Sequence, residues 1–251
     1  MENFQIVCIG GQLHYCESFF CSTASKVMIT NGNPWASGTK TEIVDVATGV
    51  SCSDLADFPV ELEAAVGGNL DGIPVVCGGR EYSEKCYKFS DGVWEEFASM
   101  KEKRYLAAGV IHSKKLHVFG GWSGSSRLQT SETIDVDGGV SDGPESPTAV
   151  WQHSMTSIND TVSLLSGGAT SANPASAQTW YYNHETEAFT SGPDLLEGRG
   201  NHGSATIVDK VTKAKIAVIT GGYKNGGGNW MDSTELLING QWETGTVQGR
   251  N

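Results

Sequence analysis

The chain has 251 residues, with 17 basic and 29 acidic side chains, so its formal net charge is −12. This charge disfavours a nucleic-acid partner, because phosphate contacts need clustered Lys and Arg. No apolar run of about 18 residues occurs, so we expect no membrane-spanning helix. Gly accounts for 32 residues and Pro for 7, which favours a fold with many turns over a disordered chain.

Strand-like runs that end in two glycines recur along the chain. Four copies end in Gly78-Gly79, Gly120-Gly121, Gly167-Gly168 and Gly221-Gly222, and a degenerate copy ends at Gly32. The second glycines are at 32, 79, 121, 168 and 222, which gives steps of 47, 42, 47 and 54 residues. Glycine suits a tight exit from a strand because it reaches positive φ at little steric cost. A period near 50 residues predicts a repeat architecture built from four-stranded units.

In chain order, the repeat predicts five units, of which the first lacks an inner strand. The expected strands are 27–30, 42–46 and 50–52; 64–70, 73–77, 85–89 and 93–97; 104–112, 116–119, 132–136 and one near 140; 152–158, 162–166, 179–183 and 188–190; and 202–208, 215–220, 235–238 and 241–243. Trp94 and Trp242 follow the turn dipeptides Asp91-Gly92 and Asn239-Gly240. We expect these tryptophans, with Phe189 as their counterpart, to pack between neighbouring units.

On these repeats, the chain resembles kelch-repeat β-propeller proteins over about residues 26–246. The resemblance implies an all-β fold, a kelch-type β-propeller over residues 26–251 with about five recognisable four-stranded blades. Kelch propellers commonly have six or seven blades, and the first and last strands of the chain usually share one blade. Residues 1–25 are expected to be an atypical leader or an N-terminal extension, because residues 21–25 are similar to the end of a signal peptide. For closure of the ring two alternatives are expected: either residues 1–25 help to close it, or the chain is a truncated form of a longer protein.

All six cysteines lie at or before residue 86. Cys77 and Cys86 are expected on neighbouring antiparallel strands, so they could form a disulfide. Secreted kelch-like chains are similar in that Cys-Gly-Gly is followed by Cys-Tyr. Cys8 and Cys16 hint at a second pair, and the alternative is that all six are buried thiols. Because no Cys-x-x-Cys and no histidine pair with ligand spacing occurs, we expect no metal site and no cofactor.

Two further motifs suggest modification or catalysis. Asn159-Asp160-Thr161 is a glycosylation sequon in an expected turn, so Asn159 is a predicted glycosylation site, with a plain turn as the alternative. His112 and His117 are expected on the two strands of one hairpin, where a structural role is more common than a catalytic one. No phosphate-loop, Gly-x-Ser-x-Gly or His-Glu-x-x-His pattern occurs.

One face of the predicted propeller is the candidate binding surface. In a four-stranded antiparallel blade, the loops after the second strand and the loops between blades emerge on the same face, which we call the loop face. Arg, Tyr and Trp are enriched at binding hot spots, and these loops carry many of them. The predicted binding residues are Arg80, Tyr82, Arg104, Tyr105, Trp122, Arg127, Trp151, His153, Arg199, His202, Tyr223 and Trp230, with Asp232 beside them.

We therefore expect a non-enzymatic, secreted or extracellular binding module that presents this face to a protein or glycan partner. One alternative is a cytoplasmic substrate adaptor similar to the kelch half of BTB–kelch ubiquitin-ligase adaptors. Another is an enzyme resembling galactose oxidase or the sialic acid epimerases, which also use kelch propellers. The last is least favoured, because no constellation of paired His and Tyr typical of a copper site occurs.

Overall fold

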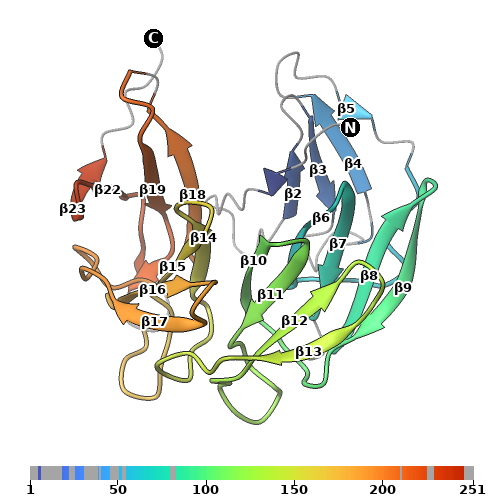
Figure 1. The fold of residues 1–251 in the computed structure, drawn as a ribbon, viewed down its shortest axis with the longest axis horizontal. Coiled ribbons are helices and arrows are strands. Elements are labelled where there is room, and N and C mark those ends of the chain that lie inside the picture. The colour runs from blue at the N-terminus through green and yellow to red at the C-terminus, as the bar shows by residue number, and fades with distance from the viewer. Residues whose placement is uncertain are drawn as a thin grey trace.

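The structure is a computed structural model that describes residues 5–6, 19–22, 26–30, 39, 41–45, 51–52, 55–79, 83–209, 211–224 and 229–245. These residues form β-strands joined by turns and loops, and no helix is found among them. Five larger antiparallel sheets follow one another along the chain, and a two-stranded ribbon branches from the fifth (Figure 1). The predicted all-β fold with several four-stranded sheets is confirmed.

Within each of the five larger sheets the strands are hydrogen-bonded in the order in which they follow along the chain, and in the fifth sheet the two-stranded ribbon interrupts this order. The first sheet holds β1 (Gln5–Ile6), β2 (Phe19–Ser22), β3 (Lys26–Thr30), β4 (Thr41–Asp45) and β5 (Ser51–Cys52), and the second holds β6 (Val66–Leu70), β7 (Ile73–Cys77), β8 (Lys85–Ser90) and β9 (Val93–Ser99). The third holds β10 (Ala108–His112), β11 (Lys115–Phe119), β12 (Ser131–Asp135) and β13 (Val140–Gly143), and the fourth holds β14 (Ser154–Ser157), β15 (Val162–Ser166), β16 (Thr179–Asn183) and β17 (Ala188–Ser191). The fifth holds β18 (Gly203–Val208), β19 (Lys215–Thr220), β22 (Thr234–Ile238) and β23 (Gln241–Gly245), and the ribbon holds β20 (Tyr223–Lys224) and β21 (Asn229–Trp230).

The first sheet differs from the prediction, which left it without an inner strand. β2 pairs with β3 in an antiparallel register that runs from Phe19 opposite Thr30 to Ser22 opposite Val27. The run Phe19-Phe20-Cys21-Ser22 is rich in aromatic residues that favour strands, and a short connection brings it back beside β3. Parts of residues 1–25 therefore belong to the first sheet, which has five strands rather than three.

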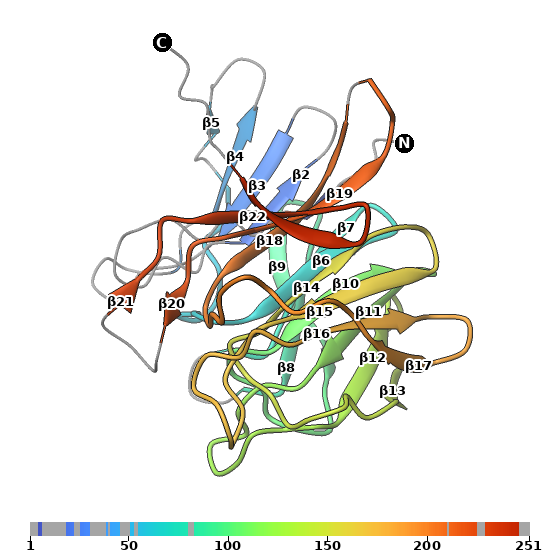
Figure 2. The same ribbon diagram turned by 90° about the vertical axis from the view of Figure 1, so that its left-hand side faces the viewer.

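The sheets are arranged around a common centre, with the inner strands β2, β6, β10, β14 and β18 facing it and the outer strands pointing away (Figures 1 and 2). Inner strands of successive sheets are in contact, from β2 and β6 through β10 and β14 to β18. No contact of comparable extent joins β18 to the described strands of the first sheet. This arrangement is compatible with a β-propeller, but a closed ring is not found in the described part of the chain.

Backbone hydrogen bonds join the sheets at the start of their inner strands. Ala64, Leu106, Gln152 and Asn201 occupy the same place in the second to fifth sheets, and each has a left-handed backbone with φ between 50° and 58°. The amide of Leu106 donates to the carbonyl of Ala64, that of Gln152 to Leu106, and that of Asn201 to Gln152, at 2.9–3.0 Å. We call these four residues the inter-sheet chain. It links four sheets without using a side chain.

The double glycines allow the linker to the next sheet to pass directly over the end of the second strand. The amide of Gly121 donates to the carbonyl of Val150 at 2.8 Å, and the amide of Gly168 donates to the carbonyl of Arg199 at 2.8 Å. A Cβ atom at Gly120 would clash with the same Val150 oxygen, and one at Gly167 would lie 2.5 Å from the Arg199 oxygen. The repeated Gly-Gly is therefore required by close backbone approach as well as by positive φ.

Aromatic side chains fill the space between sheets, as the sequence predicted. Trp94 packs against Phe58 and Phe89, and its indole N–H donates to Thr41 Oγ1 of the first sheet at 2.9 Å. Trp242 is buried in the fifth sheet, and its indole N–H donates to a carbonyl of the preceding linker at 2.9 Å. Phe189 packs against Phe119 of the neighbouring sheet and Tyr182 of its own. These rings serve the core.

The predicted disulfide between Cys77 and Cys86 is present. The two residues lie directly opposite each other on the antiparallel strands β7 and β8, and both are fully buried. They pack among aliphatic side chains such as Val75, Leu116 and Ile134, so the bridge is enclosed in the core between the second and third sheets. Cys8 and Cys16, the second suggested pair, lie outside the described residues.

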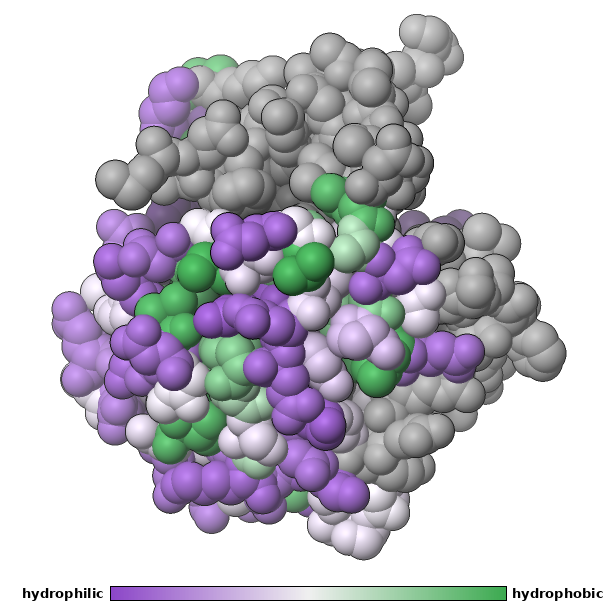
Figure 3. All heavy atoms as spheres, turned by 90° about the vertical axis from the view of Figure 1, so that its right-hand side faces the viewer, coloured by the Kyte–Doolittle hydropathy of each residue, from purple (hydrophilic) through white to green (hydrophobic). Residues whose placement is uncertain are grey.

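The outer strands of the second sheet form a hydrophilic surface. Lys85 pairs with Glu96 at 2.8 Å and Lys88 with Glu95 at 3.4 Å across β8 and β9. Figure 3 views this side of the molecule and shows hydrophilic side chains interspersed with smaller hydrophobic areas. Because such exposed ion pairs are well solvated, this surface is a weaker candidate for a binding site than the loop face.

Candidate binding site on the loop face

The structure divides the predicted binding residues into three groups by burial. Arg104, His153, Arg199, His202 and Tyr223 are buried; Tyr105, Trp122, Arg127 and Trp151 are half-buried; and Trp230 is exposed, with 45% of its surface accessible. Asp232 is also exposed. Arg80 and Tyr82 lie outside the described residues. The buried side chains cannot contact a partner without local rearrangement, so the surface depends on the other two groups.

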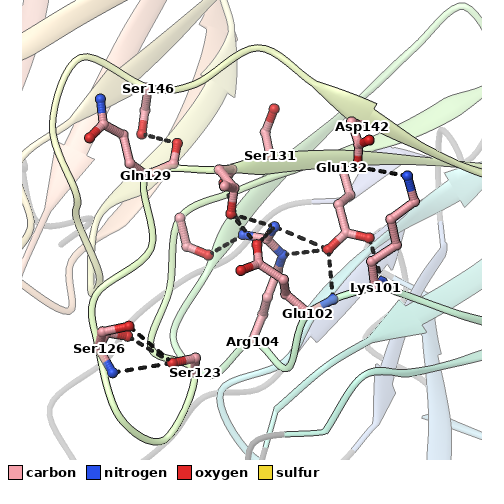
Figure 4. Close-up of polar contacts among 12 residues, drawn as sticks. Lys101, Glu102, Arg104, Ser123, Ser126, Gln129, Ser131, Glu132, Asp142 and Ser146 are labelled. Carbon is pink, nitrogen blue, oxygen red and sulfur yellow. Dashed lines mark hydrogen bonds and ion pairs between the residues drawn. The ribbon is translucent and has the colours of Figure 1, made fainter.

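Arg104 is a buried residue that forms hydrogen bonds and an ion pair inside the protein, and it is not a surface cation. Its Nε and Nη2 atoms donate to Glu132 Oε1 at 3.1 and 3.0 Å, and Nη1 donates to the carbonyl of Gly120 at 2.8 Å (Figure 4). The second oxygen of Glu132 accepts the amide of Lys101 at 2.6 Å, while Oε1 also accepts the amide of Glu102 at 3.1 Å. One buried carboxylate thus fixes the linker that leads from the second sheet to the third.

Arg199 repeats this arrangement in the fifth sheet. Its Nη2 donates to Glu235 Oε1 at 2.5 Å, and its Nη1 donates to the carbonyl of Gly221 at 2.8 Å. The amides of Leu196 and Glu197 donate to the two oxygens of Glu235 at 2.8 and 3.3 Å. The two arginines therefore have matching structural roles, and neither offers a free guanidinium at the surface.

His153 and His202 lie inside the seams between sheets. His202 Nε2 is 2.8 Å from Ser154 Oγ and 3.2 Å from Ser166 Oγ, which join the fifth sheet to the fourth. Burial lowers the pKa of each histidine to about 3, and the positive charge of Arg104 near His153, or Arg199 near His202, acts in the same direction. Both imidazoles are therefore neutral at ordinary pH and belong to the interior.

Three of the predicted residues do come together on the loop face. The ring centroids of Trp122 and Trp151 are 5.3 Å apart with an interplanar angle of 42°. The guanidinium carbon of Arg127 is 5.8 Å from the Trp122 centroid and 6.0 Å from the Trp151 centroid. These distances are within the range of cation–π attraction. We call these three residues the Trp–Arg cluster.

The backbone around the Trp–Arg cluster is well fixed. Trp122 pairs with Tyr105 through two hydrogen bonds of 2.7 and 3.0 Å, and it also forms a bridge with Arg127. Ser123 accepts the Ser126 amide with its hydroxyl and donates its own amide to the Ser126 carbonyl at 3.0 Å, which closes the loop tightly. Trp151 comes from the next linker, so the cluster spans the third and fourth sheets.

A second aromatic pair lies beside this cluster in the direction of the fifth sheet. Tyr223 and Trp230, on the ribbon of β20 and β21, have ring centroids 5.9 Å apart. The hydroxyl of Tyr223 donates to Gln152 Oε1, and Gln152 directly follows Trp151 in the chain. The loop face therefore carries aromatic groups over three successive sheets.

A histidine cluster on the opposite face was only partly visible in the sequence. His112 and His184 stack with centroids 4.0 Å apart, and His117 lies 5.0 Å from His184. The hairpin already predicted that His112 and His117 are near each other. The contact with His184 spans two sheets and had no local signal. Burial, followed by neighbouring histidines, lowers the pKa of His184 to about 3 and that of His117 to about 4.

Several other sequence predictions can be placed in the structure. Asn159 is exposed in the turn between β14 and β15, where its Oδ1 accepts the amides of Thr161 and Val162, and its glycosylation stays a prediction. Among the described residues, no set of three or more His, Cys, Asp or Glu side chains is arranged to hold a metal ion. The described part of the chain also contains no helix that could cross a membrane.

The comparisons with known proteins give no family assignment. No protein-family model matches the chain, and no curated protein matches it either.

Proposed function

We propose that the protein is a kelch-type β-propeller that acts as a non-enzymatic binding module and presents its loop face to a protein or glycan partner. The double-glycine repeat and the successive four-stranded sheets support the kelch assignment. The observation that carries the binding function is the Trp–Arg cluster, formed by Trp122, Arg127 and Trp151.

The cluster has the properties of a preformed anchor site. Tryptophan and arginine dominate binding hot spots, because they combine large contact area with polar groups. The tight loop of residues 122–127 and the backbone pairing of Trp122 already hold the side chains in place. A partner would therefore bind without a large ordering cost at this site.

The direct test is a binding screen of the full chain against immobilised peptides and glycans, followed by calorimetric titration of the hits. Trp122→Ala should weaken binding by about 2 kcal/mol or more, as expected for a hot-spot residue. Lys115→Ala is the matched control, because Lys115 is exposed beside the β10–β11 turn on the opposite face. Loss of binding in the Lys115 variant, with the Trp122 variant unaffected, would show that the binding surface lies on the opposite face and would contradict this proposal.

We also propose an extracellular location. The disulfide between Cys77 and Cys86 supports it, because such bonds persist in oxidising compartments. A free-thiol count on protein purified from its native source tests this location, and free thiols at both positions would argue against it.

A further inference from the structure

Arg127 differs from the other two arginines that the structure describes. Arg104 and Arg199 are fully buried, and each forms an ion pair with a glutamate. Arg127 is half-buried against two tryptophan rings, and it has no carboxylate partner among the described residues. In a chain with 29 acidic side chains, an arginine held in place without an ion pair is available to an external anion.

Two hydrogen-bond donors of the same cluster also lack acceptors. Arg127 Nε and Trp151 Nε1 are shielded from solvent, and neither has a hydrogen-bond partner in the part of the chain that the structure describes. A shielded donor without an acceptor costs free energy, so such groups need an explanation. An acceptor supplied from outside the chain would remove this cost once a local rearrangement of the cluster exposed the two donors to it.

We propose that the Trp–Arg cluster binds the carboxylate of an acidic side chain in a protein partner. A guanidinium presents a planar fork of N–H groups that a carboxylate can accept in a bidentate manner, and these charge-assisted hydrogen bonds are among the stronger ones. The faces of Trp122 and Trp151 would pack against the aliphatic part of the same side chain. This inference rests on the proposed binding function and adds the chemical class of the ligand.

The charge of the whole chain favours a single acidic group over a polyanion. With a net charge of −12, the protein repels a ligand that carries many negative charges. One cation fixed between two rings can offset this repulsion for one carboxylate at short range. An Asp or Glu in an otherwise near-neutral peptide segment matches this condition better than nucleic acid or an acidic polysaccharide.

The experiment uses the full chain and capped tripeptides in which Glu or Gln is flanked by glycine. Binding is followed by the nuclear magnetic resonance shifts of the indole N–H groups of Trp122 and Trp151. The Glu peptide should bind at least about tenfold more tightly than the Gln peptide, because the neutral amide loses the charge-assisted bonds. This preference should weaken as salt is added. Sialyllactose, which carries a carboxylate on a sugar, and lactose, which lacks one, form a parallel pair.

Variants of Arg127 separate this inference from the proposed function. Arg127→Gln should abolish the preference for Glu, Arg127→Lys should keep part of it, and Lys115→Gln, which removes a charge on the opposite face, should leave it unchanged. Equal binding of Glu and Gln peptides that still depends on Trp122 would overturn the carboxylate inference but leave the binding function intact. No response of either indole to any probe would overturn the carboxylate inference, and so would selective binding of sialyllactose alone.

Discussion

At the scale of single residues, Leu106 shows how backbone conformation limits substitution. It has φ of 53°, which is unfavourable for a residue with a Cβ atom, and its amide donates to the carbonyl of Ala64 at 3.0 Å. The hydrogen bond between sheets compensates part of this strain. Position 106 therefore needs both an amide proton and access to the left-handed region.

We expect Leu106→Pro to lower the free energy of unfolding by about 3 kcal/mol or more, because proline removes the donor and fixes φ near −65°. Leu106→Gly is the matched control, since it keeps the donor and adopts positive φ freely, and it should change stability by about 1 kcal/mol or less. Urea denaturation monitored by tryptophan fluorescence measures both. Similar losses in the two variants would contradict this account of the inter-sheet chain.

The buried ion pair of Arg104 and Glu132 leads to a second prediction. Glu132→Gln leaves the buried guanidinium of Arg104 with only the partly exposed carboxylate of Glu102, 3.0 Å away, so the variant should lose about 3 kcal/mol of stability. Asp142→Asn breaks the exposed pair with Lys101, at 2.7 Å on the surface, and should cost about 1 kcal/mol or less. If the two variants unfold at the same denaturant concentration, the carboxylate of Glu132 does not hold the linker as described.

Much of the residue-level detail could not be predicted from the sequence. Arg104 and Arg199 were expected at the surface, but their glutamate partners are 28 and 36 residues away in the chain. No local pattern marks such a pair before the sheets are assembled. By contrast, Trp122 and Arg127 were expected on the loop face, because they follow a double glycine directly, and the structure brings them together with Trp151.

At the scale of elements, successive sheets place two different kinds of residue at the same position of the linker. The residue two places before the inter-sheet chain is Arg104 in the third sheet and Arg199 in the fifth, but Leu62 in the second and Val150 in the fourth. The strand position of the two glutamates is taken by Tyr87 and Trp180, which lie opposite Val76 and Leu165. Leu62 and Tyr87 pack in one apolar cluster. The residue types at these two positions thus alternate between ion-pairing and apolar from sheet to sheet.

This alternation predicts that the ion pair can be replaced by the apolar pair of the neighbouring sheet. The double variant Arg104→Leu with Glu132→Tyr should recover part of the stability lost in Glu132→Gln, because no buried charge remains. Recovery should be incomplete, since the linker amides of Lys101 and Glu102 lose their acceptor. A double variant less stable than Glu132→Gln would show that the two linker solutions are not interchangeable.

Strand positions were predicted better than any other feature of the elements. Paired glycines, Asp-Gly and Asn-Gly turns follow many of the strands, and the expected ranges in the second to fifth sheets agree with the observed ones to within a few residues. The missed inner strand, β2, lies in a segment that was interpreted as a leader because of its small residues. A strand and the end of a signal peptide share similar residue types, and only the pairing with β3 separates them.

At the scale of the whole molecule, the neutral histidines make stability depend on pH. The folded-state pKa values of His117, His153, His184 and His202 are about 4, 3, 3 and 3, all below the ordinary value of 6.5. The unfolded chain therefore binds protons more readily than the folded one in this range. Stability should be largest above about pH 6.5 and should fall as the pH decreases towards 4 and 3.

Urea denaturation at about pH 7 and about pH 4.5 measures this loss. His184→Gln removes one group whose pKa is lowered by burial. The variant should therefore lose less stability than the wild type between these two pH values. Because the same carboxylates titrate in the wild type and in the variant, the difference between their losses of stability reports the contribution of His184. An identical pH dependence in the variant would exclude His184 as a source of the acid sensitivity.

The disulfide also contributes at this scale, because it constrains the unfolded chain. It closes a loop with a sequence separation of 9, for which the chain-entropy model gives roughly 2–3 kcal/mol. Reduction, or the double variant Cys77→Ala with Cys86→Ala, should lower the free energy of unfolding by at least about this amount. A non-reduced peptide digest of protein made in an oxidising compartment should contain the two cysteines in one linked fragment, and finding them as separate free thiols would refute the pairing.

The inter-sheet chain determines which residues of the loop face can be substituted without loss of the fold. Ala64, Leu106, Gln152 and Asn201 hold four sheets together through backbone atoms alone, so the joint places no demand on what their side chains contain. All four must tolerate positive φ, and Leu106, Gln152 and Asn201 must also keep an amide proton, which disfavours proline and β-branched residues. A library randomised at Leu106 within that limit should keep the scaffold folded while the chemistry near Trp151 changes, whereas changes at Gln152 would also remove the acceptor of the Tyr223 hydroxyl. The framework and the proposed binding surface can then be altered independently at that position.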